Sequence, residues 1–478
     1  MSDKVSSHRQ YLTRKILGAT AVFASVEVMT IVCSVIRTKL IALWIGTVGV
    51  GLFGLYNSAV DMLTTLAQMG VRSSGVKEVA SSPAGMRDSV IYVVRRYGLY
   101  LAIVGLLLTI VLSPLLSVIT FGDAGRSWTF VVLSVVVMCN VLTMRESVVL
   151  QGVNRLGTLA RASVWATVVS LALSVPVIYV YRIDSVVPVI IIYAAVTAVF
   201  YLLMRYRPPH DVVKPSAAQM REVGSGMLRL GAYLTVSGVV TGIVSYLVMS
   251  YMNYAGGEEL MGYYQSGFVL SVRYAGIVFT AMGMEYFPRI ASVGNSGLRR
   301  MCVMVRHQCV VTLMLITSLA VIMAAAAPWI VRLLYSSEFD PVVPIVILAA
   351  PGLLFRGVSW CMGYVIVARG DGRLFLFTEL SSGAICLLLN VVCFMAWGVP
   401  GIGISFTLWY FIYGIIVWRV VHSRYGLIFA GAPARIGVLC VSAVVCVCVL
   451  SFCVGPWTAT AVAAVVSFLL LRTIKRRS

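Results

Sequence analysis

Charge is scarce in this sequence, and its scarcity excludes most classes of soluble protein. Charged residues make up 11% of the 478 residues, whereas 60% are hydrophobic. A soluble globular domain has about 25% charged residues, so this chain cannot build a soluble surface. Apolar stretches of about 20 residues, long enough to cross a bilayer as a helix, recur along the whole sequence. Because lipid cannot hydrogen-bond open backbone groups, these stretches must be helical. The sequence therefore predicts an all-α polytopic membrane protein.

Motifs that carry chemistry are also lacking. The sequence has no phosphate-binding glycine loop, no pairing of a nucleophile with a base, and no metal-ligand spacing. Its 11 cysteines lie in or beside apolar runs, where cysteine usually packs as a small apolar residue, and its 4 histidines are scattered. We therefore expect no catalytic residue, no metal, no cofactor and no disulfide framework. The protein is not expected to be an enzyme.

About fourteen apolar segments have the length and composition of membrane spans. The first carries Glu27 and shows no small-residue cleavage site, so we expect a retained span rather than a cleaved signal peptide. The predicted spans are residues 16–36, 50–70, 97–119, 128–150, 161–181, 186–204, 229–251, 262–285, 308–330, 343–367, 374–396, 401–420, 435–454 and 457–472.

The distribution of lysine and arginine predicts the orientation of these spans. Of the 37 such residues, 30 fall in the two terminal segments and the loops predicted to share their side of the membrane. Another 5 fall on the opposite side, and 2, Arg273 and Arg356, lie within spans. Basic residues collect in the cytoplasm, so both termini are predicted to be cytoplasmic. The net charge of +20 is then explained by basic residues that contact anionic lipid head groups. Because this charge is spread over many short segments and forms no patch, nucleic acid is not expected as a partner.

The chain is predicted to consist of two related halves. Gly54-Leu55-Tyr56-Asn57-Ser58 in the second span is similar to Gly262-Tyr263-Tyr264-Gln265-Ser266 in the eighth. Repeats of this kind occur in transporters, with the substrate site at the interface between the halves. The predicted organisation is a first lobe at 1–204, a cytoplasmic linker at 205–228, a second lobe at 229–422, an additional helix pair at 434–472 and a basic cytoplasmic tail at 473–478.

Polar side chains recur at steps of three or four residues in several spans, so they share a helix face. The second span has such a stripe from Asn57 to Arg72, and the fourth has one that begins at Asn140. Several stripes together favour a water-filled central cavity, and the alternative is packing by hydrogen bonds between helices. The polar residues that we predict to contact a substrate in this cavity are Asn57, Gln68, Arg72 and Asn140.

Ionisable residues near the middle of a span are costly and usually functional. Glu27 lies about 16 Å along its span at 1.5 Å per residue, and Asp61, Arg273 and Arg356 also fall near the centres of theirs. The alternative to a functional role is a static salt bridge between an acid and an arginine. A transporter without a nucleotide-binding motif needs an ion gradient as its energy source. Glu27 and Asp61 are therefore our candidates for binding the coupling ion.

Several stretches resemble the Wzx-type O-antigen translocases, in the polysaccharide-transporter branch of the multidrug/oligosaccharidyl-lipid/polysaccharide exporter superfamily. The resemblance covers roughly residues 10–425. The stretches that carry it are Arg37–Ala42, Gly49–Tyr56, Gly70–Ala80, Leu150–Arg155, Ala160–Ser163, Gly276–Gly283, Tyr286–Ile290, Leu334–Phe339 and Tyr364–Asp371.

The resemblance implies two bundles of about six helices each, around a central cavity that opens alternately to each side. It also implies an undecaprenyl-pyrophosphate-linked repeat unit as cargo, cavity arginines for the pyrophosphate, and acidic residues for a coupling cation, either proton or sodium. Arg273 and Arg356 are our candidates for the pyrophosphate contacts, by their depth and chemistry. The other partners we expect are membrane lipids and a polysaccharide polymerase complex. The helix pair at 434–472 is additional to the two bundles.

Three other functions compete with a flippase. A drug or toxin extruder of the same superfamily would have a more aromatic site, whereas the central arginines favour a phosphorylated cargo. A polysaccharide polymerase or ligase would need an extracytoplasmic catalytic surface, and the short outside loops leave little room for one. A scaffold for polysaccharide assembly would not need buried charge.

Overall fold

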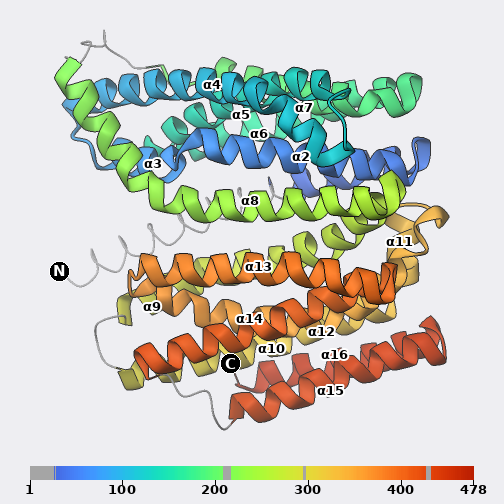
Figure 1. Ribbon diagram of the computed structural model, residues 1–478. Helices are drawn as coiled ribbons and strands as arrows, with labels where there is room; N and C mark the ends of the chain where they lie inside the picture. Colours follow the sequence, from blue (N-terminus) through green and yellow to red (C-terminus); the bar gives the residue numbers. More distant parts are fainter. Residues whose placement is uncertain (1–25, 27, 208–216, 294–297, 427–431, 478) are drawn as a thin grey trace. The chain divides into compact units, whose positions relative to one another are not determined.

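The computed structural model describes residues 26, 28–207, 217–293, 298–426 and 432–477, and all the regular structure in them is helical (Figure 1). Residues 28–44 are helical and precede the first labelled helix. The other elements are α2 (Thr47–Gln68), α3 (Val71–Ser81), α4 (Ala84–Phe121), α5 (Ser127–Gly152), α6 (Leu156–Tyr181), η1 (Arg182–Ser185), α7 (Val186–Leu203), α8 (Ala217–Phe268), η2 (Val269–Tyr274), α9 (Ala275–Val293), α10 (Leu298–Ala325), α11 (Ala327–Leu334), η3 (Ser337–Phe339), α12 (Val342–Ala368), α13 (Gly372–Trp397), α14 (Val399–Tyr425), α15 (Ala432–Cys453) and α16 (Pro456–Arg477).

The described helices account for the predicted spans. Nine stretches of the described chain are long and apolar enough to cross a membrane. Two of them, Leu156–Leu203 and Thr235–Thr280, each contain two predicted spans. The predicted spans 50–70 and 457–472 overlap α2 and α16, whereas much of the predicted span 16–36 lies outside the described residues, and its part from residue 28 onward is helical. The fold is therefore the all-helical, polytopic membrane fold that the sequence predicts.

The chain divides into two compact units: unit 1 (Met1–Ile45 and Leu52–Gly242) and unit 2 (Gly46–Gly51 and Ile243–Ser478). The start of α2 belongs to unit 2 because it packs closely on Gly262. A Cβ atom at Gly262 would lie 2.1 Å from the carbonyl oxygen of Thr47, so only glycine allows this approach. α8 begins inside the predicted linker 205–228, and its Gly257 has a left-handed φ of 73° that interrupts the helix.

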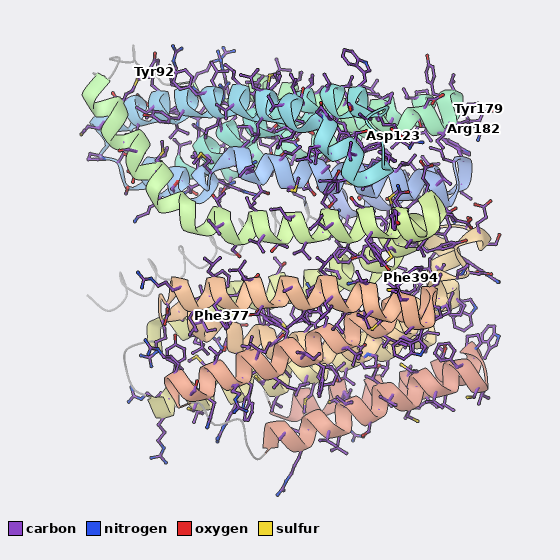
Figure 2. All side chains as sticks on the ribbon, in the orientation of Figure 1. Tyr92, Asp123, Tyr179, Arg182, Phe377 and Phe394 are labelled. Carbon is purple, nitrogen blue, oxygen red and sulfur yellow. The ribbon has the colours of Figure 1, made fainter. Side chains whose placement is uncertain are left out.

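In unit 1, α4 packs along α5, and α6 pairs with α7. At 38 residues, α4 is about 57 Å long, which exceeds the roughly 30 Å of hydrocarbon in a bilayer. Arg182 ends α6 with a φ of 48°, donates a hydrogen bond to the carbonyl oxygen of Trp44 at 3.2 Å, and covers the ring of Tyr179. Figure 2 shows Tyr179 and Arg182 side by side at one end of the unit, with Tyr92 at the other end. These contacts fix the end of the unit that is predicted to face outward.

In unit 2, α12 packs against α10 and α14, and α13 packs on α14. Phe377 and Phe394 mark the two ends of α13 in Figure 2. The last two helices, α15 and α16, pack on α10, as Figure 1 shows. The predicted span 308–330 is interrupted: α10 ends at Ala325, and the short helix α11 follows. Residues such as Gly352, where a Cβ would lie 2.7 Å from Phe406, let these helices approach closely, as small residues do in membranes.

Candidate functional site

Arg356 lies in the middle of a membrane helix. It follows Val342, the first residue of α12, by about 21 Å along the helix axis, and a similar length of helix follows it. The same helix contains Pro351, one turn before the arginine. Proline supplies no N–H and leaves a carbonyl oxygen one turn earlier without its helical donor. The arginine therefore stands beside an interruption of the helical hydrogen bonds.

Two side chains from other helices form hydrogen bonds with the backbone groups at this interruption. The Sγ of Cys448, on α15, donates to the carbonyl oxygen of Ile347 at 3.3 Å, which is the oxygen that Pro351 leaves without a donor. The Oγ1 of Thr407, on α14, donates to the carbonyl oxygen of Leu348 at 2.6 Å and accepts from the N–H of Gly352 at 3.1 Å. Neighbouring helices commonly re-satisfy the backbone around a membrane proline in this way. The additional helix α15 thus supports the segment that carries Arg356.

The guanidinium of Arg356 is half-buried among aromatic rings. Its Nη1 donates to the carbonyl oxygen of Val272 at 3.0 Å. Its Cζ lies 5.0 Å from the ring centroid of Phe279 and 5.6 Å from that of Tyr410, distances at which a cation is attracted to the ring faces. A guanidinium has five N–H donors in a planar fork, so the bond to Val272 leaves others to bind a ligand. This geometry suits an anion with several oxygens.

Arg273 lies next to the backbone that Arg356 contacts. It belongs to η2, a π-helical segment of six residues in unit 2. Single π-helical turns inside α-helices occur frequently at functional sites. The side chain of Arg273 is exposed, whereas that of Arg356 is half-buried. The structure thus brings Arg356 onto the segment that contains Arg273. That the two arginines share one cargo site stays a prediction.

A row of hydrogen bonds joins α13 to α14 in the same unit. The Oη of Tyr413 donates to Oε1 of Glu379 at 3.3 Å, the indole N–H of Trp409 donates to Ser382 at 3.0 Å, and Ser405 donates to Oδ1 of Asn390 at 3.2 Å. These bonds hold one polar face of α13 against the aromatic face of α14. The polar spacing of α13 is visible in the sequence, and so is the four-residue spacing of Ser405, Trp409 and Tyr413, but the sequence does not show that these two helix faces meet.

A small cavity lies beside this row. Its volume is about 20 Å³, and its lining includes Ser271, Asn390 and Ser405. The hydroxyl of Ser271 is buried and has no hydrogen-bond partner among the described residues. A volume of this size holds one water molecule, which would satisfy that hydroxyl.

The predicted stripe on the second span is not continuous. α2 ends at Gln68, Met69 and Gly70 have φ values of 44° and 66°, and Arg72 lies in the next helix, α3. The prediction that Arg72 shares one helix face with Asn57 is therefore wrong, because the left-handed backbone at these two residues turns the chain. Along α2 itself, Asp61 is exposed, and Asn57 and Gln68 are half-buried.

The amide of Asn57 donates to the carbonyl oxygen of Phe53 at 2.6 Å, within its own helix. Asn140 is half-buried on α5. Glu27 lies outside the described residues. Asn57, Gln68, Arg72, Asn140 and Asp61 all belong to unit 1, and their contact with a substrate or an ion stays a prediction.

An ionic network links segments of unit 1. The side chain of Glu146, on α5, is fully buried and lies 2.7 Å from Nη2 of Arg95, on α4. The Nε of Arg145 donates to the same carboxylate at 3.2 Å. Arg95 also donates to the carbonyl oxygen of Tyr206, just beyond α7, at 2.8 Å. The pair of Glu146 and Arg95 therefore ties α4, α5 and the segment after α7 together.

Solved structures with the same fold are transporters. The chain superposes with a TM-score of 0.70 on an inward-facing multidrug resistance MATE family transporter of the MOP superfamily, at 14% identity over 83% of this chain and 94% of that one. The TM-score is 0.63 for the inward closed conformation of the lipid II flippase MurJ, at 12% identity over 95% and 99% of the two chains. It is 0.60 for a MOP superfamily transporter from Pyrococcus furiosus, at 14% identity over 85% and 95%.

The family follows from the sequence itself. No curated protein matches the chain. Residues 21–344, about two thirds of its length, match the family described as polysaccharide biosynthesis protein. With the fold of the MOP superfamily transporters established by the structural matches, the chain belongs to the polysaccharide biosynthesis protein family.

Proposed function

We propose that the protein is a flippase of the Wzx type. It moves an undecaprenyl-pyrophosphate-linked oligosaccharide repeat unit from the cytoplasmic to the periplasmic leaflet of a bacterial inner membrane, by ion-coupled alternating access. The observation that carries the proposal is the half-buried guanidinium of Arg356 in the middle of α12, with N–H donors beyond the one used by Val272. The membership in a polysaccharide biosynthesis family and the fold shared with a lipid II flippase support it.

Deletion of the gene tests this proposal. We expect lipid-linked oligosaccharide to build up facing the cytoplasm while its synthesis continues, because the cargo is made but not transferred. A complementing copy of the gene should remove the accumulated material. Normal surface polysaccharide in the deletion strain, with no such accumulation and no second gene of this family present, would contradict the proposal.

Extrusion of a drug or toxin is the second candidate function. Phe406, Trp409 and Tyr410 pack with ring centroids 4.4–6.1 Å apart, and Arg356 lies over the ring of Tyr410. Aromatic faces bind lipophilic cations well. The multidrug transporter of the same fold points in the same direction. A deletion strain that becomes sensitive to such cations, but keeps its surface polysaccharide, would favour this function over the flippase.

The proposed orientation makes a direct prediction for reporter fusions. Fusions after residues 210 and 478 should both report the cytoplasm, since basic residues gather on the side that contains both positions. A fusion after Asp123, between α4 and α5, should report the periplasm. Paired alkaline phosphatase and fluorescent protein fusions measure this. An extracytoplasmic signal at residue 210 or 478 would overturn the orientation.

Ion coupling makes a second prediction. One of Glu27 and Asp61 is proposed to carry the coupling ion, because a carboxylate at membrane depth changes its affinity for a cation when its surroundings change. In reconstituted vesicles, Glu27→Gln or Asp61→Asn should leave cargo binding intact but remove the dependence of flipping on a pH or sodium gradient. Glu379→Gln, on the polar face of α13, serves as the comparison in the other unit. Gradient-dependent flipping that persists in both of the first two variants would exclude them from the mechanism.

A further inference from the structure

A second cationic cavity lies in unit 2 between the end of α9 and the start of α10. Its volume is about 810 Å³. Arg289 from α9, and Arg299, Arg300 and His307 from α10, contribute to its lining. Arg356 and Arg273 do not, so this cavity is separate from the candidate cargo site.

The spacing on α10 turns one helix face toward this cavity. Arg299, Val303 and His307 follow one another at steps of four residues, and Arg300, Met304 and Gln308 do the same. Residues four apart lie above one another on an α-helix. The first two turns of α10 therefore present cationic, apolar and polar side chains in successive layers to one space.

Arg299 and Arg300 are cations without a counter-charge in this space. Both side chains are exposed, and in the described part of the chain neither forms a salt bridge. Arg289 is paired, because its Nη2 lies 2.5 Å from Oε1 of Glu285. Like charges held in one concavity repel one another and raise the local potential. An anion that enters the cavity would relieve this repulsion.

The walls of the cavity are apolar. Val303 is 62% exposed, and Met304 and the buried Tyr286 complete the apolar part of the lining. Tyr286 donates to the carbonyl oxygen of Cys361 at 3.0 Å and packs on Trp360, so this wall is fixed to α12. An apolar wall beneath a cationic rim suits a molecule with a charged head and an apolar body, rather than a small hydrated ion.

The distribution of basic residues places this end of unit 2 at the cytoplasmic surface, where the head groups of anionic lipids lie. We propose that the cavity binds the phosphate group of a membrane lipid head group, with Arg299 and Arg300 as its principal contacts. The planar guanidinium binds phosphate oxygens bidentately, and the apolar wall receives the first carbons of the lipid. Binding at this site does not require transport.

A lipid-borne phosphate has two sources in such a membrane: an anionic phospholipid and a prenyl pyrophosphate. Native mass spectrometry of the full-length protein separates them, because each lipid adds its own mass. The probes are phosphatidylglycerol, undecaprenyl pyrophosphate and inorganic pyrophosphate, with phosphatidylcholine as the reference lipid. The test variant is Arg299→Ala/Arg300→Ala. The matched control is Arg373→Ala/Arg435→Ala, which removes the same charge from the same side of the membrane but outside the cavity.

We expect the test variant to bind its preferred phosphate lipid at least about tenfold more weakly than the wild type, because it loses the charge-assisted hydrogen bonds of two guanidinium groups. The control pair should change the affinity by less than about threefold, as for screened surface charges. Arg299→Lys/Arg300→Lys should retain part of the binding. Whichever of the two lipids shows this pattern is the source.

Two results would overturn the proposal. Equal loss of binding in the test and control pairs would show general attraction to a basic surface. Binding of inorganic pyrophosphate as tight as that of either lipid would show a site for soluble anions. Because occupancy is measured without transport, failure of the flippase proposal leaves this test unaffected, and a variant that misfolds is recognised by its loss of the folded charge-state distribution.

Discussion

Replacing Arg356 with alanine is expected to abolish export while the protein remains inserted in the membrane. The substitution removes the cation in the middle of α12 and the planar fork that would hold two oxygens of a pyrophosphate. Loss of two charge-assisted hydrogen bonds weakens binding by roughly 100-fold or more. Arg356→Lys should restore only part of the activity, because an ammonium is a point charge without the fork. Surface polysaccharide in a deletion strain, complemented with each variant, measures the effect.

Arg126 provides a matched control. It also lies over an aromatic ring, 4.3 Å from the centroid of Phe121, but it stands in the loop between α4 and α5 rather than in the middle of a helix. Arg126→Ala should leave export near the wild-type level. Arg273→Ala tests the second arginine, and the double variant with Arg356→Ala tests the pair. Normal export by the double variant would remove both arginines from the cargo site.

Replacing Glu146 with alanine is expected to produce the largest loss of stability. The carboxylate is fully buried and pairs with both Arg95 and Arg145, so its removal leaves two partly buried cations without the negative charge that they share. Breaking a buried ion pair from one side costs about 3–5 kcal/mol. Glu146→Gln keeps the shape and one acceptor oxygen, and should lose less. The free energy of unfolding of the purified protein, from denaturant titration in detergent micelles, measures the effect.

The ion pair between Arg332 and Asp340 is the appropriate comparison. Its atoms approach to the same 2.7 Å, but the two side chains are 62% and 41% exposed. Surface pairs contribute about 0–1 kcal/mol, so Asp340→Ala should hardly change the unfolding free energy. Equal losses in Glu146→Ala and Asp340→Ala would contradict the structural role assigned to the buried network.

The membrane spans could be predicted because composition alone distinguishes an apolar stretch of about 20 residues from a loop. The depth of Arg356 followed from counting along its span. The break between α2 and α3 did not follow, because it depends on left-handed backbone at Met69 and Gly70. Spacing arguments assume one uninterrupted helix, and they fail where the backbone turns.

The interhelical network had no comparable signal in the sequence. Glu146 and Arg95 are separated by 51 residues, and no periodicity within one helix connects them. The repair of the Pro351 interruption by Thr407 and Cys448 is similar. A proline in a span indicates that donors are needed, but only the packing of the helices shows which residues supply them. The cavity between α9 and α10 is a further example. The spacing of Arg299, Val303 and His307 predicts a shared face on α10, but the sequence does not show that Tyr286 of α9 lies opposite this face.

The most direct test of the central claim is a flipping assay with the purified protein in liposomes. Undecaprenyl-pyrophosphate-linked oligosaccharide is placed in one leaflet, and a glycosidase outside the vesicles measures its arrival in the other. We predict that the wild type transfers the oligosaccharide faster when an ion gradient is imposed, and that the Arg356→Ala variant does not transfer it. Failure of the wild type to transfer it under any gradient, while the same vesicles transport a lipophilic cation, would contradict the flippase and identify a drug extruder instead.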